Sequence, residues 1–236
     1  MLFLTAAAWI LLMAGRRGSL ALTHCAIAMP ASAASFQMLL ALNPPVSLAT
    51  GWALMLATMM LPLLIAPVRH VHNSSFTHRR GRAIALFVAA YAVVWMAAGV
   101  MLIALALAIR LIAPESIVPV AVAAALAMLW QFSPLKQRSL NRCHSHRELA
   151  AFGRSADIDA VRFGFTHGIW CVCSCWGLMF LPLMISRGHA AAMVAVSAWM
   201  FAERLERPMP ARWRLRGPST ALRMLVAQVG MKLQLG

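Results

Sequence analysis

The residues best suited to chemistry in this chain are one histidine and two cysteines at helical spacing. His167, Cys171 and Cys175 follow one another at i, i+4 and i+8 in the run HGIWCVCSCW. On an α-helix this spacing stacks an imidazole and two sulfur atoms along one face, with neighbouring β-carbons about 6 Å apart. Two neighbours could chelate one ion, but side chains from other helices would have to complete the site. Cys173 points away from this face.

The types of donor indicate which metals would bind. Cysteine thiolate and neutral imidazole suit zinc or Cu(I), and the scarcity of acidic residues, six in all, argues against calcium, magnesium or a di-iron site. Met59 shares a helix face with Met55, and Met60 follows it. Thioether sulfur is a reasonable ligand for Cu(I) and a poor one for zinc, so a methionine-bearing helix opposite the cysteines would favour copper. Packing in an apolar core is the alternative role for these methionines.

Two further groups of donors fall in basic segments. One is the run CHSH at 143–146, which holds Cys143 between arginines. Ligands in zinc sites usually have two to four residues between them, and the flanking arginines would repel a cation, so a solvated loop is an equally good interpretation. The histidines of the earlier basic segment are expected to be solvated rather than ligating: His70, His72 and His78.

The composition indicates which elements must position these donors. Hydrophobic residues make up 62% of the 236 residues and charged residues 11%, against roughly 45–50% and about 25% in soluble domains. This excludes a soluble globular enzyme. Since a spanning helix needs roughly 20 mostly apolar residues, the sequence predicts four spans and a shorter fifth: Leu48–Val68, Ala83–Ile109, Pro114–Phe132, Phe163–Ile185 and Ala190–Phe201.

One or two more spans are expected before residue 48, in Leu2–Ala14 and Ser19–Leu42. A signal peptide with Arg16 and Arg17 as its charged region, and a small-residue site at 31–33, is the alternative there. The predicted fold is therefore all-α, a polytopic transmembrane helical bundle of about six spans (five to seven). It forms a single membrane domain over 1–236, with an atypical N-terminal region 1–47, a helical core 48–202 and a basic tail 203–236.

The charge of +15 would suggest nucleic acid as a partner in a soluble protein. Here 17 of the 21 basic residues fall in three segments between or after the apolar runs, around 69–82, around 136–162 and after Phe201, so we expect no nucleic acid partner. The positive-inside rule places these segments and the C-terminus in the cytoplasm, with Arg110 and Arg187 outside. The expected location is the bacterial inner membrane, as a multi-pass protein.

The tail contains one more predicted element. Apolar residues recur at helical spacing with polar residues between them, which predicts an interfacial amphipathic helix at the C-terminus. These residues are Leu222, Leu225, Val226, Val229 and Leu233.

Four motifs in this order resemble those of a bacterial family of predicted metal-binding integral membrane proteins, a domain of unknown function. They are WALM at 52–55 with TMMLP at 58–62, YAVVW at 91–95, QFSPLK at 131–136 before Cys143, and His167-Gly168 before Cys171, Cys175 and Trp176. The resemblance covers roughly 48–206. It implies a bundle of about six spans with a metal, often supposed to be copper, held by His, Cys and Met side chains.

Carried over by position, the ligand candidates that the resemblance implies are Met59, Met60, Cys143, His167, Cys171 and Cys175. This chain departs from the family pattern in two places. Ser174 stands where relatives often have a second adjacent cysteine, and Cys173 stands where they tend to have glycine.

These features predict an inner-membrane protein that binds Cu(I), with zinc as the alternative metal, and performs no catalytic step. It would act as a chaperone, assembly or transfer factor for a copper enzyme, with the lipid bilayer and a membrane protein as partners. The alternative is a structural or accessory subunit of a larger respiratory or photosynthetic complex with a degenerate metal site. Thiol–disulfide exchange is disfavoured because the cysteines lack the usual two-residue spacer.

Overall fold

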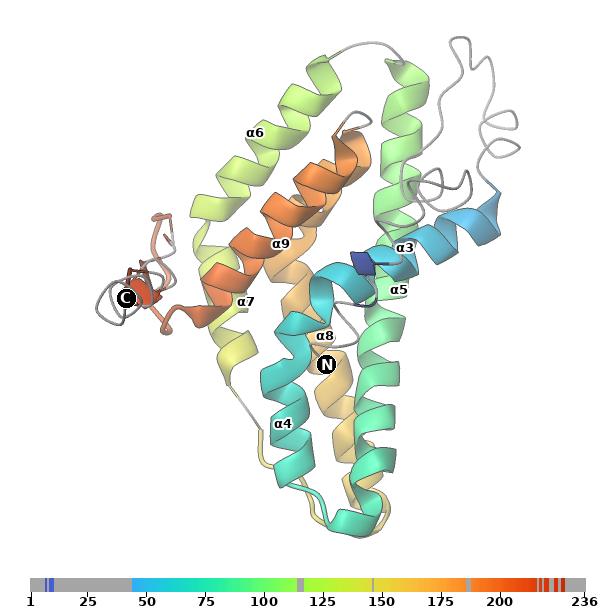
Figure 1. Cartoon of the computed structure of the whole chain (residues 1–236), viewed down its shortest axis with the longest axis vertical. Helices are drawn as coiled ribbons and strands as arrows, with labels where there is room; N and C mark the ends of the chain where they lie inside the picture. The colour runs from blue at the N-terminus through green and yellow to red at the C-terminus, as the bar shows by residue number, and fades with distance from the viewer. Residues whose placement is uncertain are drawn as a thin grey trace, which may run out of the picture.

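The computed structural model describes residues 44–113, 117–145, 147–185 and 188–215, and a few residues nearer the ends: Ala7, Trp9, Ile10, Gly217, Ser219, Thr220, Arg223, Met224, Val226 and Ala227. Within these residues all regular secondary structure is helical, which confirms the all-α prediction (Figure 1). The elements are α3 (Pro45–Met60), η1 (Pro62–Leu64), α4 (Ile65–Asn73), η2 (Thr77–Arg79), α5 (Arg80–Ile112), α6 (Val118–Phe132), α7 (Pro134–His144), α8 (Gly153–Met184) and α9 (His189–Leu205).

Some predictions lie largely outside the described residues. They are the one or two N-terminal spans, the signal-peptide alternative and most of the C-terminal amphipathic helix. The described residues of that last segment between Ser219 and Ala227 are helical.

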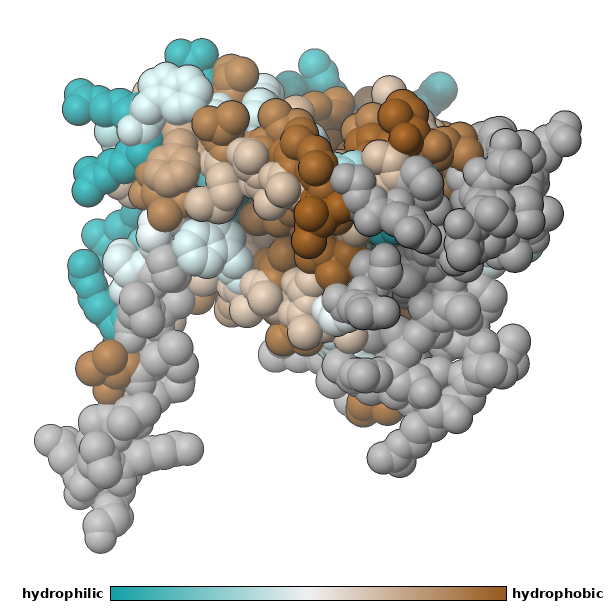
Figure 2. Space-filling model, turned by 90° about the horizontal axis from the view of Figure 1, so that it is seen from above, coloured by the Kyte–Doolittle hydropathy of each residue, from teal (hydrophilic) through white to brown (hydrophobic). Residues whose placement is uncertain are grey.

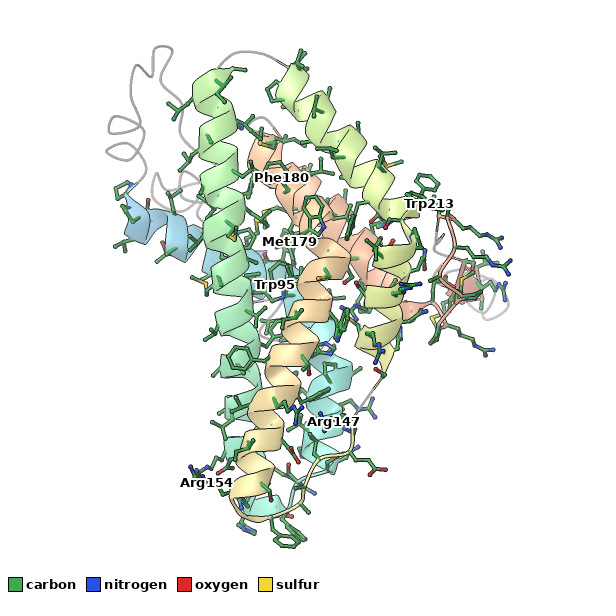
Figure 3. The ribbon with its side chains drawn as sticks, turned by 180° about the vertical axis from the view of Figure 1, so that it is seen from behind. Trp95, Arg147, Arg154, Met179, Phe180 and Trp213 are labelled. Atoms are coloured by element: carbon green, nitrogen blue, oxygen red, sulfur yellow. The ribbon has the colours of Figure 1, made fainter. Side chains whose placement is uncertain are left out.

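The long helices α5 and α8 run side by side in the same direction and form the centre of the molecule (Figure 1). Small residues let them approach closely, because a Cβ at Gly164 would lie 2.4 Å from the carbonyl oxygen of Phe87. Trp95 of α5 and Met179 of α8 lie along the seam between the two helices (Figure 3). This seam holds the face of α8 that carries the cysteines.

The shorter helices surround this pair. Helices α6, α7 and α9 pack against α8, and α3 crosses to pack against α5 and α9. The Trp52 indole of α3 donates a hydrogen bond to the Trp95 carbonyl of α5 at 2.9 Å, and Gly99 leaves room for that indole. The core therefore brings α3, α5, α8 and α9 together.

The predicted number of about six spans is too high for the described part of the chain. Only Thr77–Ile112 and Gly153–Met184 are each long and apolar enough to cross a membrane, and two bent helix pairs raise the number to at most four. The predicted span 48–68 bends by 53° after α3, where Pro62 begins η1, and the second pair bends by 63° at Pro134 between α6 and α7. The fifth predicted span lies within α9, which has 17 residues.

Basic residues of two segments meet at one end of the molecule. Arg147 and Arg154 lie at the end opposite the α5–α6 connection (Figure 3). There Asp157 of α8 binds both Arg79 and Arg82 at 2.8 Å. Viewed from the α5–α6 end, the described surface is largely apolar, and hydrophilic side chains gather mainly along one edge (Figure 2).

Candidate metal centre

Helix α8 turns the predicted donor face towards the core. His167, Cys171 and Cys175 are buried, with 5%, 0% and 3% of each residue exposed. Cys173 is half-buried on another face, where its carbonyl accepts a hydrogen bond from the Trp130 indole at 3.0 Å. The helical spacing therefore aligns the imidazole and the two thiols in one buried row.

Cys171 is the centre of a set of polar contacts. The Tyr91 hydroxyl of α5 lies 3.3 Å from its sulfur, and the Arg204 Nη2 of α9 donates to the same sulfur at 3.2 Å. One turn along α8, the Ser174 hydroxyl lies 3.3 Å from the sulfur of Cys175 and donates to the Cys171 carbonyl at 2.8 Å. Three helices thus meet at the sulfur of Cys171.

Cys143 joins this set from a distant part of the sequence. It lies in the last turn of α7, is 4% exposed, and lines the same cavity as Arg204. The charge of Arg204 acts on the sulfur atoms of Cys143, Cys171 and Cys175. The interpretation of Cys143 as part of a solvated loop is therefore wrong, because packing of α7 on α8 buries it.

The neighbouring His144 has a different role. Its Nδ1 lies 2.8 Å from the Leu140 carbonyl oxygen, and its Nε2 lies 3.0 Å from the carbonyl oxygen of Arg204. With both ring nitrogens facing carbonyl oxygens, His144 ties the end of α7 to the end of α9. It holds the backbone of Arg204 rather than pointing a nitrogen at the cysteines.

The histidines of the earlier basic segment lie in two helices, His70 and His72 in the last turn of α4 and His78 in η2. His70 Nε2 contacts the Arg147 carbonyl oxygen at 2.8 Å, and His72 Nδ1 lies 3.2 Å from the side-chain oxygen of Asn73. His78 is exposed and stacks on Phe76. His72 and His78 are exposed, as the sequence predicted, whereas His70 is half-buried and its ring packs on Phe163 at 5.6 Å.

A cavity of about 240 Å³ lies beside the thiols. Cys143, His144, His167 and Arg204 line one part of it, and apolar residues of η1, α4 and α9 line the rest. The His167 ring also packs on aromatic rings of α5 and α8, with centroid distances between 5.7 and 6.1 Å. The volume is sufficient for several water molecules, each of which occupies about 30 Å³ in the liquid.

Met59 and Met60 end α3 and are each 1% exposed in the same apolar core as Cys171 and Cys175. Helix α3 packs mainly against α5 and α9 rather than against α8. Sequence reasoning did not single out four more buried methionines in this core: Met179, Met184, Met193 and Met200. Their burial is equally typical of packing, so it does not by itself make any of them a ligand.

In the part of the chain that the structure describes, no group of three or more His, Cys, Asp or Glu side chains is arranged to hold a metal ion. At Cys171 the guanidinium of Arg204 donates to a sulfur that would be a ligand. The chemistry of the set still fits Cu(I), because buried thiols and an imidazole lie on one face of α8 and buried thioethers belong to the same apolar core.

Arg204 is the residue of this cluster that the sequence did not predict. In the sequence it is one of seven basic residues after Phe201, and nothing in its neighbours separates it from the charges that orient a membrane protein. A second internal charge was also missed, since Lys136 lies 1% exposed and pairs with Glu203, which also accepts a hydrogen bond from Gln131 at 2.9 Å.

A family model described as the copper chaperone PpoB2 matches residues 49–229. The chain belongs to this family. The PpoB2 match contains all six candidate ligands and Arg204, and it supports a copper chaperone role. It also agrees with the resemblance to a metal-binding family, and it names copper as the metal and chaperone as the activity. No curated protein and no solved structure matches the chain.

Proposed function

We propose that this member of the PpoB2 family is a membrane protein that binds Cu(I) through Cys171 and Cys175 and transfers it to a copper enzyme. Copper is then the cargo rather than a resident cofactor. The observation that carries the proposal is the buried row of Cys171 and Cys175 on α8, with the guanidinium of Arg204 3.2 Å from the Cys171 sulfur. Cys143 lines the same cavity as Arg204 and brings a third thiol to this region. Soft sulfur ligands in an apolar site suit Cu(I) better than zinc when thioethers are also near.

The remaining candidates have roles set by their positions. His167 and Cys143 line the cavity, so they would receive Cu(I) there or deliver it to the partner. Met59 and Met60 would offer weaker sulfur ligands from the α3 side of the same core. No catalytic step is needed for this activity.

The proposed location is the bacterial inner membrane, with the whole chain as a single membrane domain and the C-terminus in the cytoplasm. In the part of the chain that the structure describes, two helices are long and apolar enough to cross a bilayer, and each bent pair counted as one span raises the number to four. Basic residues of two segments, Arg79 and Arg82 beside Asp157 and Arg154 in the first turn of α8, lie at one end of the molecule, which supports the orientation under the positive-inside rule. The copper enzyme that receives the ion would then be a membrane partner, and nucleic acid has no role.

Metal analysis of the purified protein tests this proposal. We expect the reduced wild-type protein in detergent to retain Cu(I), and the double variant Cys171→Ser, Cys175→Ser to lose it. Cys173→Ser is the matched control, because Cys173 lies on the same helix outside the donor face, and it should retain copper as wild type does. Equal amounts of copper in the wild-type protein and the double variant would contradict the proposal. Zinc bound in place of copper would identify the alternative metal.

One observation favours a second candidate function. A guanidinium among the thiols is what a degenerate site would look like if an arginine had replaced the metal permanently. The protein would then be a structural or accessory subunit of a respiratory or photosynthetic complex. Wild-type protein that never retains copper, and that copurifies with subunits of such a complex, would support this function instead.

A further inference from the structure

Helix α9 directs two neighbouring charges, Glu203 and Arg204, into the interior, and only one of them has an oppositely charged side chain. Glu203 pairs with Lys136. Among the described residues, no carboxylate forms an ion pair with Arg204, and its shielded Nε has no hydrogen-bond partner. A shielded charge without an opposite charge is costly. The sulfur atoms near Arg204 are thus the groups that stabilise its guanidinium.

The guanidinium lies where a copper ion would have to bind. Its Nη2 donates to the sulfur of Cys171 at 3.2 Å, and its charge acts on Cys143 and Cys175 as well. A lone pair on sulfur that accepts this N–H cannot bind a metal at the same time. The guanidinium and Cu(I) also carry the same charge, so they exclude each other from the cluster.

We propose that the guanidinium of Arg204 occupies the copper site in the copper-free protein, and that Cu(I) displaces it from the thiols on binding. This inference rests on the proposed function. During the exchange the N–H···S bond to Cys171 breaks and a Cu–S bond forms, and each thiol that binds as a thiolate gives its proton to water. Copper stays in the +1 state throughout.

The surroundings of Arg204 allow this movement. Its side chain already lines the cavity of about 240 Å³, which provides room for the displaced guanidinium. The contact between His144 and its carbonyl oxygen, at 3.0 Å, keeps the backbone in place while the side chain turns. The side chain of Arg204 can therefore move while its backbone stays in place.

The exchange has a consequence for copper delivery. One cation leaves the sulfur cluster as the other arrives, so the guanidinium and Cu(I) never occupy the cluster together. When the partner removes Cu(I), the guanidinium can return at once and stabilise the vacated sulfur atoms. Arg204 thereby weakens the affinity for copper and speeds its release, which a transfer protein needs.

Substitution of Arg204 tests the exchange directly. Arg204→Leu should bind Cu(I) about tenfold more tightly and release it more slowly, a difference of about 1.4 kcal/mol. Arg204→Lys retains the charge and should stay nearer to wild type. Arg142→Leu is the control, because Arg142 is exposed and lies over the Trp170 ring at 5.8 Å. Affinity would be measured by competition with a chromogenic Cu(I) chelator, and unchanged or weaker binding by Arg204→Leu would overturn the inference.

A second measurement uses the wild-type chain and does not depend on how a variant folds. A small dicarbonyl reagent should modify Arg204 faster in protein loaded with Cu(I) than in copper-free protein, because the guanidinium has left the sulfur atoms. Arg110, which donates to the carbonyl oxygens of Leu183 and Met184, should react equally in both. Equal reactivity of Arg204 in a protein that does bind Cu(I) overturns the inference alone. A wild-type protein that binds no Cu(I) overturns the proposed function as well.

Discussion

Glu203 and Arg204 are neighbours on α9, yet their charges are stabilised in opposite ways. Glu203 forms a unit with Lys136 and Gln131, in which acid, base and amide bind one another. Arg204 depends on the sulfur of Cys171, a group that can bind a metal instead. The first cluster therefore fastens α9 to the α6–α7 pair, and the second can exchange its cation. The comparison separates a structural charge from a functional one.

The largest effect should come from breaking the structural unit. Glu203→Leu leaves the Lys136 ammonium buried without its carboxylate, and loss of one partner of a buried ion pair costs about 3–5 kcal/mol. The free energy of unfolding in mixed micelles would measure this cost. The double variant Lys136→Met, Glu203→Leu removes both charges and should recover most of the stability. A double variant as unstable as the single one would show that the loss does not come from the unpaired Lys136 charge.

The next effect concerns the exchangeable cluster. Cu(I) at about 100 times its dissociation constant should stabilise the wild-type protein by about 2.7 kcal/mol, because only the folded chain brings the sulfur atoms together. The variant Cys171→Ser, Cys175→Ser should show no such gain. The double variant Lys136→Met, Glu203→Leu should keep the stabilisation by Cu(I). Copper-dependent stabilisation in the cysteine variant would place the binding site elsewhere.

A smaller effect is expected from Arg204 in the absence of copper. Arg204→Leu removes a charge that has no carboxylate partner among the described residues, so its cost should be about 1 kcal/mol or less, in line with loss of one hydrogen bond. Unfolding of the copper-free protein would measure it against Glu203→Leu. A loss as large as that of Glu203→Leu would remove the distinction between the two residues.

The smallest effect should follow Met59→Leu. Exchange of methionine for leucine conserves volume in the core and usually costs less than about 1.5 kcal/mol. If Met59 is only a packing residue, Cu(I) affinity in the chelator competition stays at the wild-type value. A several-fold loss of affinity with unchanged stability would show that its thioether takes part in copper binding.

The row of His167, Cys171 and Cys175 could be predicted from the sequence because it depends only on the period of one helix. The approach of Cys143 and Arg204 could not, since it results from packing among α7, α8 and α9. Lys136 had the same appearance in the sequence as the surface arginines, although it is buried against Glu203.

The number of spans shows a similar limit. Hydropathy located the apolar stretch 48–68 but not its 53° bend at Pro62, because composition does not report the direction of a chain after a break. The same holds for Pro134 between α6 and α7, where Ser133 caps the second helix by accepting from the backbone N–H of Leu135 and Lys136. Local pattern therefore gave the helices and the donor face, and tertiary packing determined the partners.

X-ray absorption at the copper edge of the Cu(I)-loaded protein tests the central claim most directly. The account predicts sulfur neighbours of copper in the wild-type protein, and their loss in the variant Cys171→Ser, Cys175→Ser. Copper bound only by nitrogen and oxygen, or an unchanged sulfur signal in that variant, would contradict the assignment of the site to Cys171 and Cys175.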